Sequence, residues 1–187
     1  KIHIDTDPEN MLSADQPDRV LYDGIKKNFT IHDLIVFGLT DEAGAFRPAT
    51  LEKVSRIIDG ILLIPGVITD DVVSLTTTND VTIKEGQLEV RRIMREVPET
   101  LAASEALSGT IADNPLLADK LISADGTGIA VYVPIVAKDQ ARRIGSEISS
   151  LAGRELTEGQ KFYLAGLPIA EDSFGIEMFI QMGIMSP

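Results

Sequence analysis

The chain has 187 residues, enough to bury the core of one large domain or two small ones, and 44% of them are hydrophobic, which excludes simple disorder. Its formal net charge of −12 at pH 7 argues against a nucleic-acid partner, because phosphate binding requires a positive surface. The sequence contains no cysteine and only two histidines, which excludes disulfides and thiolate chemistry and argues against a histidine-rich metal site.

The sharpest chemical motif lies near the start, in IHIDTDPENM (2–11). An apolar strand that runs into Asp-x-Asp places Asp5 and Asp7 together, where they could hold a divalent cation or attack a phosphate. The nucleoside hydrolase calcium motif and the haloacid dehalogenase nucleophile loop both fail at Glu9, and the glycine and glutamate of an EF-hand are missing. We interpret the motif as a carboxylate-capped turn, and a small metal-dependent hydrolase that uses Asp5 and Asp7 is the alternative function.

Residues 29–97 are predicted to form a first βαβ unit. The apolar stretch FTIHDLIVFGLT (29–40) is typical of a strand that is buried on both faces. The returning strand is predicted over 66–78, beside 29–40 in one sheet. Between them, a helix begins at Arg47-Pro48 and ends before Pro65-Gly66, with one apolar stripe of Leu51, Val54, Ile58, Ile61 and Leu62.

Residues 98–172 repeat this order. A helix is predicted over 98–122, with a break at Asn114-Pro115. The turn SADGTG (123–128) then leads into a β-branched strand over 128–138.

A further helix and strand complete this second unit. Asp139 is predicted to cap a helix in which Arg143 and Glu147 pair across one turn. The next strand is predicted over 160–168. The apolar face of the helix consists of Ala141, Ile144, Ile148 and Leu151. The sequence therefore predicts an α/β fold with two ferredoxin-like βαβ subdomains.

The remaining polar residues form no recognisable catalytic constellation. The sequence has no glycine-rich phosphate loop and no G-x-S-x-G nucleophile motif. His32 lies among apolar strand residues and is interpreted as a packed or edge residue. The acidic pairs Asp70-Asp71 and Glu171-Asp172 are interpreted as solvated turn residues. We therefore expect no catalytic residue, no metal site and no cofactor.

The final stretch, SFGIEMFIQMGIMSP (173–187), is strongly apolar, which is unusual for a chain end. Phe174, Met178 and Met182 recur at a spacing of four residues, which fits either a packed core or a surface against lipid. Methionine-rich surfaces adapt to varied apolar partners. Phe174, Met178, Phe179 and Met182 are therefore the residues that would contact an apolar substrate if this stretch is a binding surface.

Three segments, in their order and spacing, resemble one known family. They are DTDPENMLSADQP (5–17), FRPATLEKVSRIIDGILLIPGVITDDVVSLTTTNDV (46–81) and GLPIAEDSFGIEMFIQM (166–182). Together they are similar to the first periplasmic loop of the resistance-nodulation-division (RND) superfamily, in its MMPL-like hydrophobe/amphiphile exporter branch. The strongest elements are Asp5, Asp7, Pro8, Glu9, Asn10 and Met11 in the first segment, and Pro65, Gly66, Val67, Val72, Ser74 and Leu75 in the second.

This resemblance implies a periplasmic porter domain, situated between transmembrane helices 1 and 2 of a proton-driven inner-membrane exporter. The cargo would be a lipid or another hydrophobic compound, such as a hopanoid-type molecule, which the domain would bind and gate without acting as an enzyme. A docking domain with no ligand of its own is a further alternative.

The resemblance also implies a layout along the chain. Residues 1–28 would connect from a membrane helix, 29–97 and 98–172 would be the porter subdomains, and 173–187 would approach the next membrane helix. The expected partners are the hydrophobic substrate, the remaining domains and membrane helices of the parent transporter, and, as an open alternative, further copies of the chain. The proton-carrying residues would lie outside this chain.

Overall fold

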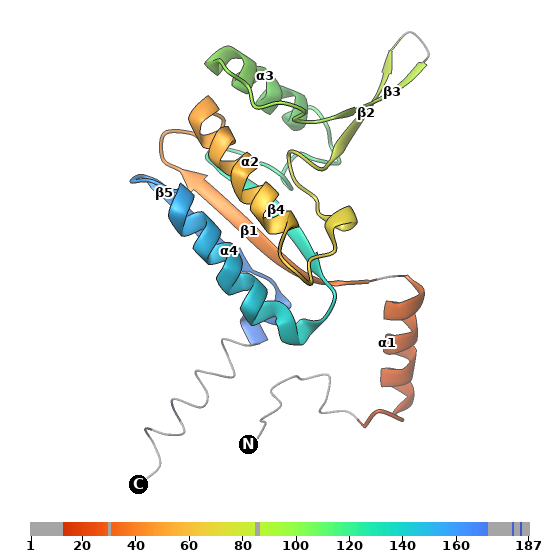
Figure 1. The fold of residues 1–187 in the computed structure, drawn as a ribbon. Coiled ribbons are helices and arrows are strands. Elements are labelled where there is room, and N and C mark those ends of the chain that lie inside the picture. The colour runs from red at the N-terminus through yellow and green to blue at the C-terminus, as the bar shows by residue number, and fades with distance from the viewer. Residues whose placement is uncertain (1–12, 30, 85–86, 172–180, 182–183, 185–187) are drawn as a thin grey trace.

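The computed structural model describes residues 13–29, 31–84, 87–171, 181 and 184. A three-stranded antiparallel sheet lies in the middle of the molecule, with its strands in the order β4-β1-β5 (Figure 1). A separate two-stranded ribbon, β2-β3, stands with α3 at the end opposite to α1. In chain order the elements are α1 (Pro17–Asn28), β1 (Asp33–Asp41), α2 (Pro48–Leu62), η2 (Thr69–Asp71), β2 (Asn79–Lys84), β3 (Gln87–Arg92), α3 (Leu101–Ala112), β4 (Gly128–Ile135), η3 (Lys138–Gln140), α4 (Ala141–Glu155) and β5 (Gln160–Ala165).

The central strand β1 buries one face and leaves the other partly open. Its alternate residues Ile35, Phe37 and Leu39 are buried, whereas those between them are half-buried. Phe162 of β5 stacks on Phe37, with ring centroids 6.3 Å apart. The predicted strand is therefore confirmed, but the prediction that both of its faces are buried is wrong, because the helices cover one face.

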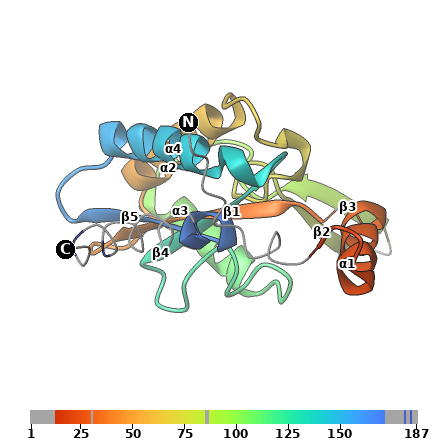
Figure 2. The ribbon, with the colours of Figure 1, turned by 90° about the horizontal axis from the view of Figure 1, so that it is seen from below.

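Helices α2 and α4 lie side by side over that buried face (Figure 2). Gly60 allows the close approach of the two helices, because a Cβ there would lie only 2.7 Å from a methyl group of Leu151. The predicted apolar faces of both helices point to the core, and each fully buried aliphatic side chain contributes about 1.5–3 kcal/mol. The buried residues are Thr50, Leu51, Val54, Ile57, Ile58 and Ile61 from α2, and Ala141, Ile144, Gly145, Ile148 and Ala152 from α4.

Residues 66–78 do not form the predicted strand beside 29–40. Val67 and Val73 make isolated antiparallel bridges to β4, and the neighbours of β1 are β4 and β5. Side-chain hydrogen bonds replace a strand ladder here: the Thr77 hydroxyl donates to the Val72 carbonyl at 2.6 Å, and the Thr77 amide donates to Ser74 Oγ at 3.2 Å. Short polar side chains compete with the ladder in this way, and η2 occupies the centre of the segment.

The two predicted halves interleave in one sheet. Strand β1 belongs to the first half and lies between β4 and β5 of the second half, so β4 and β5 run parallel to each other without being neighbours. The mixed α/β class is confirmed, whereas the predicted arrangement of two successive βαβ units differs from the observed topology. Two local predictions also change: α3 ends at Ala112, before the predicted break, and Asp139 lies in η3 without capping α4.

Two turns explain how β4 and β5 are placed. The predicted turn before β4 is confirmed: the Asp125 carboxylate accepts hydrogen bonds from Ser123 Oγ and from the Thr127 amide and hydroxyl at 2.5–3.0 Å. These hydrogen bonds lower the pKa of Asp125 to about 2. After β5, Gly166 adopts a φ of 125°, and a side chain there would collide with the Leu34 carbonyl, so this turn requires glycine.

The first described helix, α1, falls within the predicted connector 1–28 and has no buried residue. It is amphipathic, and Val20, Leu21, Tyr22 and Ile25 on it are exposed. Lys26 approaches Asp33 at the start of β1, with 3.6 Å between Nζ and Oδ1. Among the residues that the structure describes, no helix is both long enough and apolar enough to span a membrane.

Candidate functional site

The four residues predicted to bind substrate lie outside the described part of the chain. The hydrolase alternative depends on two further residues at the start of the chain, which the structure also leaves undescribed. Both assignments therefore stay predictions. The residues outside the described ranges are Phe174, Met178, Phe179, Met182, Asp5 and Asp7.

His32 lies one residue before β1, the central strand of the sheet, and is half-buried. Its Nε2 is 3.6 Å from Oδ2 of Asp71, and both side chains are partly exposed. Within residues 13–29, 31–84 and 87–171, no group of three or more His, Asp or Glu side chains could hold a metal ion. This pair is therefore a surface contact between the residue before β1 and the end of η2.

Among the described residues, the most buried carboxylate is that of Asp41, at the end of β1, and it connects three elements. Its Oδ2 accepts hydrogen bonds from Thr50 Oγ1 of α2 at 2.7 Å and from Gln160 Nε2 of β5 at 2.8 Å. Its Oδ1 accepts from the Ala43 amide at 2.9 Å. Lys53 Nζ reaches the same cluster through Gln160 Oε1, at 2.9 Å.

The protonation of Asp41 follows from this environment. Burial raises the pKa of the carboxyl, but the hydrogen bonds from Gln160, Thr50 and the Ala43 amide, together with the Arg47 charge, outweigh it, so the net pKa is lowered. A shallow hollow of about 500 Å³ lies beside this cluster. Both carboxylate oxygens of Asp41 accept hydrogen bonds from the protein, so we interpret the cluster as structural.

An open groove of about 1030 Å³ lies between β3 and α3. Its lining combines apolar and charged side chains, and its volume is close to the upper limit of small-molecule sites. We define the groove by Val90, Arg91, Arg92, Ile93, Met94, Arg95, Glu96, Val97, Pro98, Glu99, Thr100, Ala103 and Leu107.

The floor of the groove is anchored to the body of the protein. The Ile93 amide donates to the Thr78 carbonyl and the Met94 amide to the Leu75 carbonyl, both at 3.0 Å. The Met94 side chain is buried, so this segment is fixed where the chain leaves β3. The floor is therefore a stable platform and not a free loop.

Helix α3 supplies the opposite wall. Thr100 caps it, because its Oγ1 accepts a hydrogen bond from the Ala103 amide at 3.2 Å. Ile111 is fully buried and ties the helix to the core, which leaves Ala103 and Leu107, one turn apart, to face the groove. At the far side, Asn114 Nδ2 donates to Asp80 Oδ1 at 2.8 Å and links the segment after α3 to the ribbon.

The β2-β3 ribbon extends the groove with an exposed apolar face. Val81 pairs with Val90 across the ribbon, and Leu88 lies two residues before Val90, so the three share one face. Their exposed fractions are 55%, 55% and 68% respectively. Because an isolated two-stranded ribbon does not bury its own apolar face, this surface is available to a partner or a ligand.

Basic side chains border the groove of this acidic protein. Arg91 is paired with Glu89, with Nη2 and Oε2 2.7 Å apart. Arg92 and Arg95 are exposed, and neither makes a side-chain hydrogen bond or ion pair with any residue of the described ranges. Arg92 lies two residues after Val90 and so belongs to the apolar face of the ribbon.

The sequence analysis missed this groove. The signal that could have found it is the alternation in VTIKEGQLEV (81–90), where every second residue is apolar around a Glu-Gly pair, the pattern of a hairpin with one apolar face. The wall depends on α3, which lies downstream, and its packing against β3 cannot be read from local spacing.

The chain matches no model of a known protein family, and a search of curated proteins likewise finds no match. The candidate site is therefore argued from its own geometry.

Proposed function

We propose that this chain is a periplasmic porter domain of a proton-driven RND/MMPL-type inner-membrane exporter, which binds and gates a lipid or another hydrophobic compound. The observation that carries the proposal is the groove between β3 and α3, which combines a large open volume with apolar residues of the floor, the wall and the ribbon. Such a surface can hold a molecule with apolar parts.

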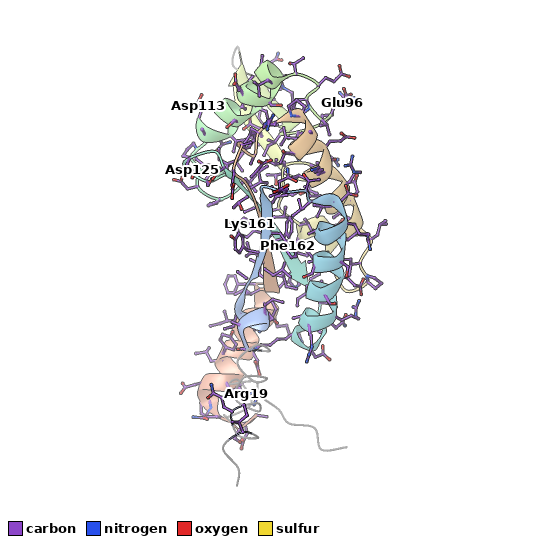
Figure 3. The ribbon with its side chains drawn as sticks, turned by 90° about the vertical axis from the view of Figure 1, so that its left-hand side faces the viewer. Arg19, Glu96, Asp113, Asp125, Lys161 and Phe162 are labelled. Carbon is purple, nitrogen blue, oxygen red and sulfur yellow. The ribbon has the colours of Figure 1, made fainter. Side chains whose placement is uncertain are left out.

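The position of the groove supports this proposal. Figure 3 places Glu96, on the groove, at the opposite end of the molecule from Arg19 of α1. Strand β5 ends near the start of β1, since Ala165 pairs with Val36. The two ends of the described fold thus lie away from the groove. In an exporter, the flanking segments would lead to membrane helices. They would hold the groove at a distance from the bilayer, on the side where cargo leaves the protein.

The independence of the ribbon supports a gating role. Strands β2 and β3 pair with each other and, within the described residues, with no strand of the main sheet. The ribbon can therefore change its angle to α3 without breaking the β4-β1-β5 sheet. Such a movement would open or close the groove.

The test is export by the whole product of the gene that encodes this chain, compared with cells that lack it. We expect cells with the gene to accumulate less of a neutral lipophilic fluorescent dye, and a protonophore to abolish the difference. Ala103→Glu, which places a charge in the groove, should remove the export activity. Ala102→Glu is the matched control, since Ala102 is also exposed on α3 but does not line the groove.

Two results would contradict the proposal. One is equal dye accumulation with and without the gene, when the protein is present at its normal level. The other is a loss of export that is the same for both alanine variants, because the groove would then not be the site that matters.

A further inference from the structure

The groove has charged residues beside its apolar ones, and the apolar residues do not explain them. An apolar site needs no cations, and exposed arginines beside apolar surface lose solvation when a hydrocarbon covers that surface. In a chain with a net charge of −12, the groove nevertheless has Arg92 and Arg95 at its border, without side-chain partners among the described residues.

From this arrangement we infer that the groove binds amphiphiles with a hydrocarbon tail and an anionic head, the head on Arg92 and Arg95 and the tail on the apolar floor. This inference rests on the proposed function and names the class of cargo within it. Arginine suits the task because its planar guanidinium can donate two parallel hydrogen bonds to one carboxylate or phosphate.

The positions of the two arginines match the polarity of such a ligand. Arg92 ends β3, directly beyond Val90 on the apolar face, and Arg95 follows the buried Met94. A tail along Val90, Val97 and Leu107 would therefore begin beside a cation. Arg91 is less suited to the head, because Glu89 already occupies its guanidinium.

Two acidic residues on the same groove limit the number of anionic groups that it can hold. Glu96 and Glu99 are exposed and stand between Arg95 and the start of α3. They would repel a second negative charge placed toward the helix. The groove is therefore suited to a head group with one anionic centre, such as a carboxylate or a phosphodiester, and less suited to a highly charged polyanion.

The experiment measures binding of two probes to the full chain by titration calorimetry below their micelle concentrations. Laurate carries a carboxylate head, and monolauroylglycerol carries the same acyl chain with a neutral head. We expect laurate to bind about tenfold more tightly, and added salt to reduce that difference, since the Debye length falls to about 3 Å at 1 M.

Variants of the chain test where the anionic head group binds. Replacing both arginines, by Arg92→Gln and Arg95→Gln, should weaken laurate binding about tenfold and leave monolauroylglycerol binding unchanged. The control variant, Lys27→Gln with Arg154→Gln, removes two exposed cations outside the groove and should change neither affinity. Ala103→Glu should weaken both probes, because it obstructs the groove itself.

Three outcomes would overturn the inference: equal affinities for the two probes, an effect of the control variant as large as that of the arginine variant, or no binding of either probe. Binding of monolauroylglycerol that is as tight as that of laurate would leave the exporter proposal standing with a neutral cargo. The dye-export comparison decides the exporter proposal separately, so the two can fail independently.

Discussion

At the scale of single residues, Asp41 shows how a buried charge can serve a structural purpose. Its carboxylate is nearly inaccessible, and the donors on α2 and β5 that satisfy it, Thr50 and Gln160, are distant in the sequence. Desolvation of a carboxylate is costly, and hydrogen bonds to the ionised form repay that cost. Asp41 therefore links the end of β1 to the first turn of α2 and to the start of β5.

We expect Asp41→Ala to lower the free energy of unfolding by about 1–3 kcal/mol near neutral pH, because buried donors on Thr50 and Gln160 lose their acceptor. Urea denaturation measures this loss. The matched control is Asp59→Ala, which removes an exposed carboxylate of α2 with no side-chain hydrogen bond among the described residues and should change stability little.

The pH dependence of the same variant gives a second readout. The pKa of Asp41 is lowered in the folded state, so its ionised form contributes stability above the unfolded value of 3.8 and loses that contribution as the pH falls through the lower folded pKa. The original chain and Asp41→Ala differ in their free energy of unfolding. The part of this difference that depends on the Asp41 charge should become smaller as the pH falls below the folded pKa of Asp41. A difference that grows on acidification would contradict this account.

At the scale of elements, the ribbon and the main sheet are hydrogen-bonded separately from each other. The ribbon has exposed apolar residues on one face, and within the described residues its strands pair only with each other. The sheet has a closed core under α2 and α4. A change in the ribbon should therefore alter binding more than stability.

Shortening the ribbon tests this separation. Asn79 and Arg92 pair directly, so residues 80–91 can be replaced by a two-residue Asn-Gly turn. We expect the melting temperature to change by only a few degrees, since the loss of the Asn114–Asp80 hydrogen bond corresponds to about 1 kcal/mol. Binding of monolauroylglycerol should weaken, because Val90 leaves the groove. A cooperative loss of the whole fold, measured by circular dichroism, would show that the ribbon supports the sheet.

At the scale of the whole molecule, the function depends on whether the ligand binds in the groove or at the Asp5 and Asp7 motif, which lies outside the described residues. The groove lies at one end and α1 at the other (Figure 3), whereas the hydrolase alternative requires a metal site at Asp5 and Asp7, before α1. A ligand that binds only the native state raises the melting temperature. Thermal unfolding can therefore distinguish the porter proposal from the hydrolase alternative.

We expect calcium at about 1 mM to leave the melting temperature unchanged relative to magnesium at the same concentration, because the sequence around Asp5 and Asp7 departs from the known calcium motifs. Magnesium controls for general screening of the acidic chain. The variant with Asp5→Asn and Asp7→Asn should behave identically. A calcium-specific increase that this variant abolishes would favour the hydrolase.

The sequence alone determined the local elements whose signals are periodic. The stripe of α2, the ion pair of Arg143 with Glu147 at 2.6 Å, and the turn before β4 were all predictable, because spacing along the chain decides which side chains share a face or a turn. The mixed α/β class followed from the same signals. The strand predicted over 66–78 was wrong. Its β-branched residues are typical of a strand, but Thr77 makes local hydrogen bonds to Ser74 and Val72, which form turns instead.

Only the tertiary structure decided how these elements combine. Apolar periodicity identifies a buried face but not the neighbour that buries it, so the insertion of β1 between β4 and β5 could not be read from the chain. The groove follows the same rule. Val90, Arg92 and Arg95 lie close in sequence, whereas Ala103 and Leu107 reach them only because buried Met94 and Ile111 fix β3 and α3 to one core. Packing between distant segments, which no local pattern encodes, therefore creates the candidate site.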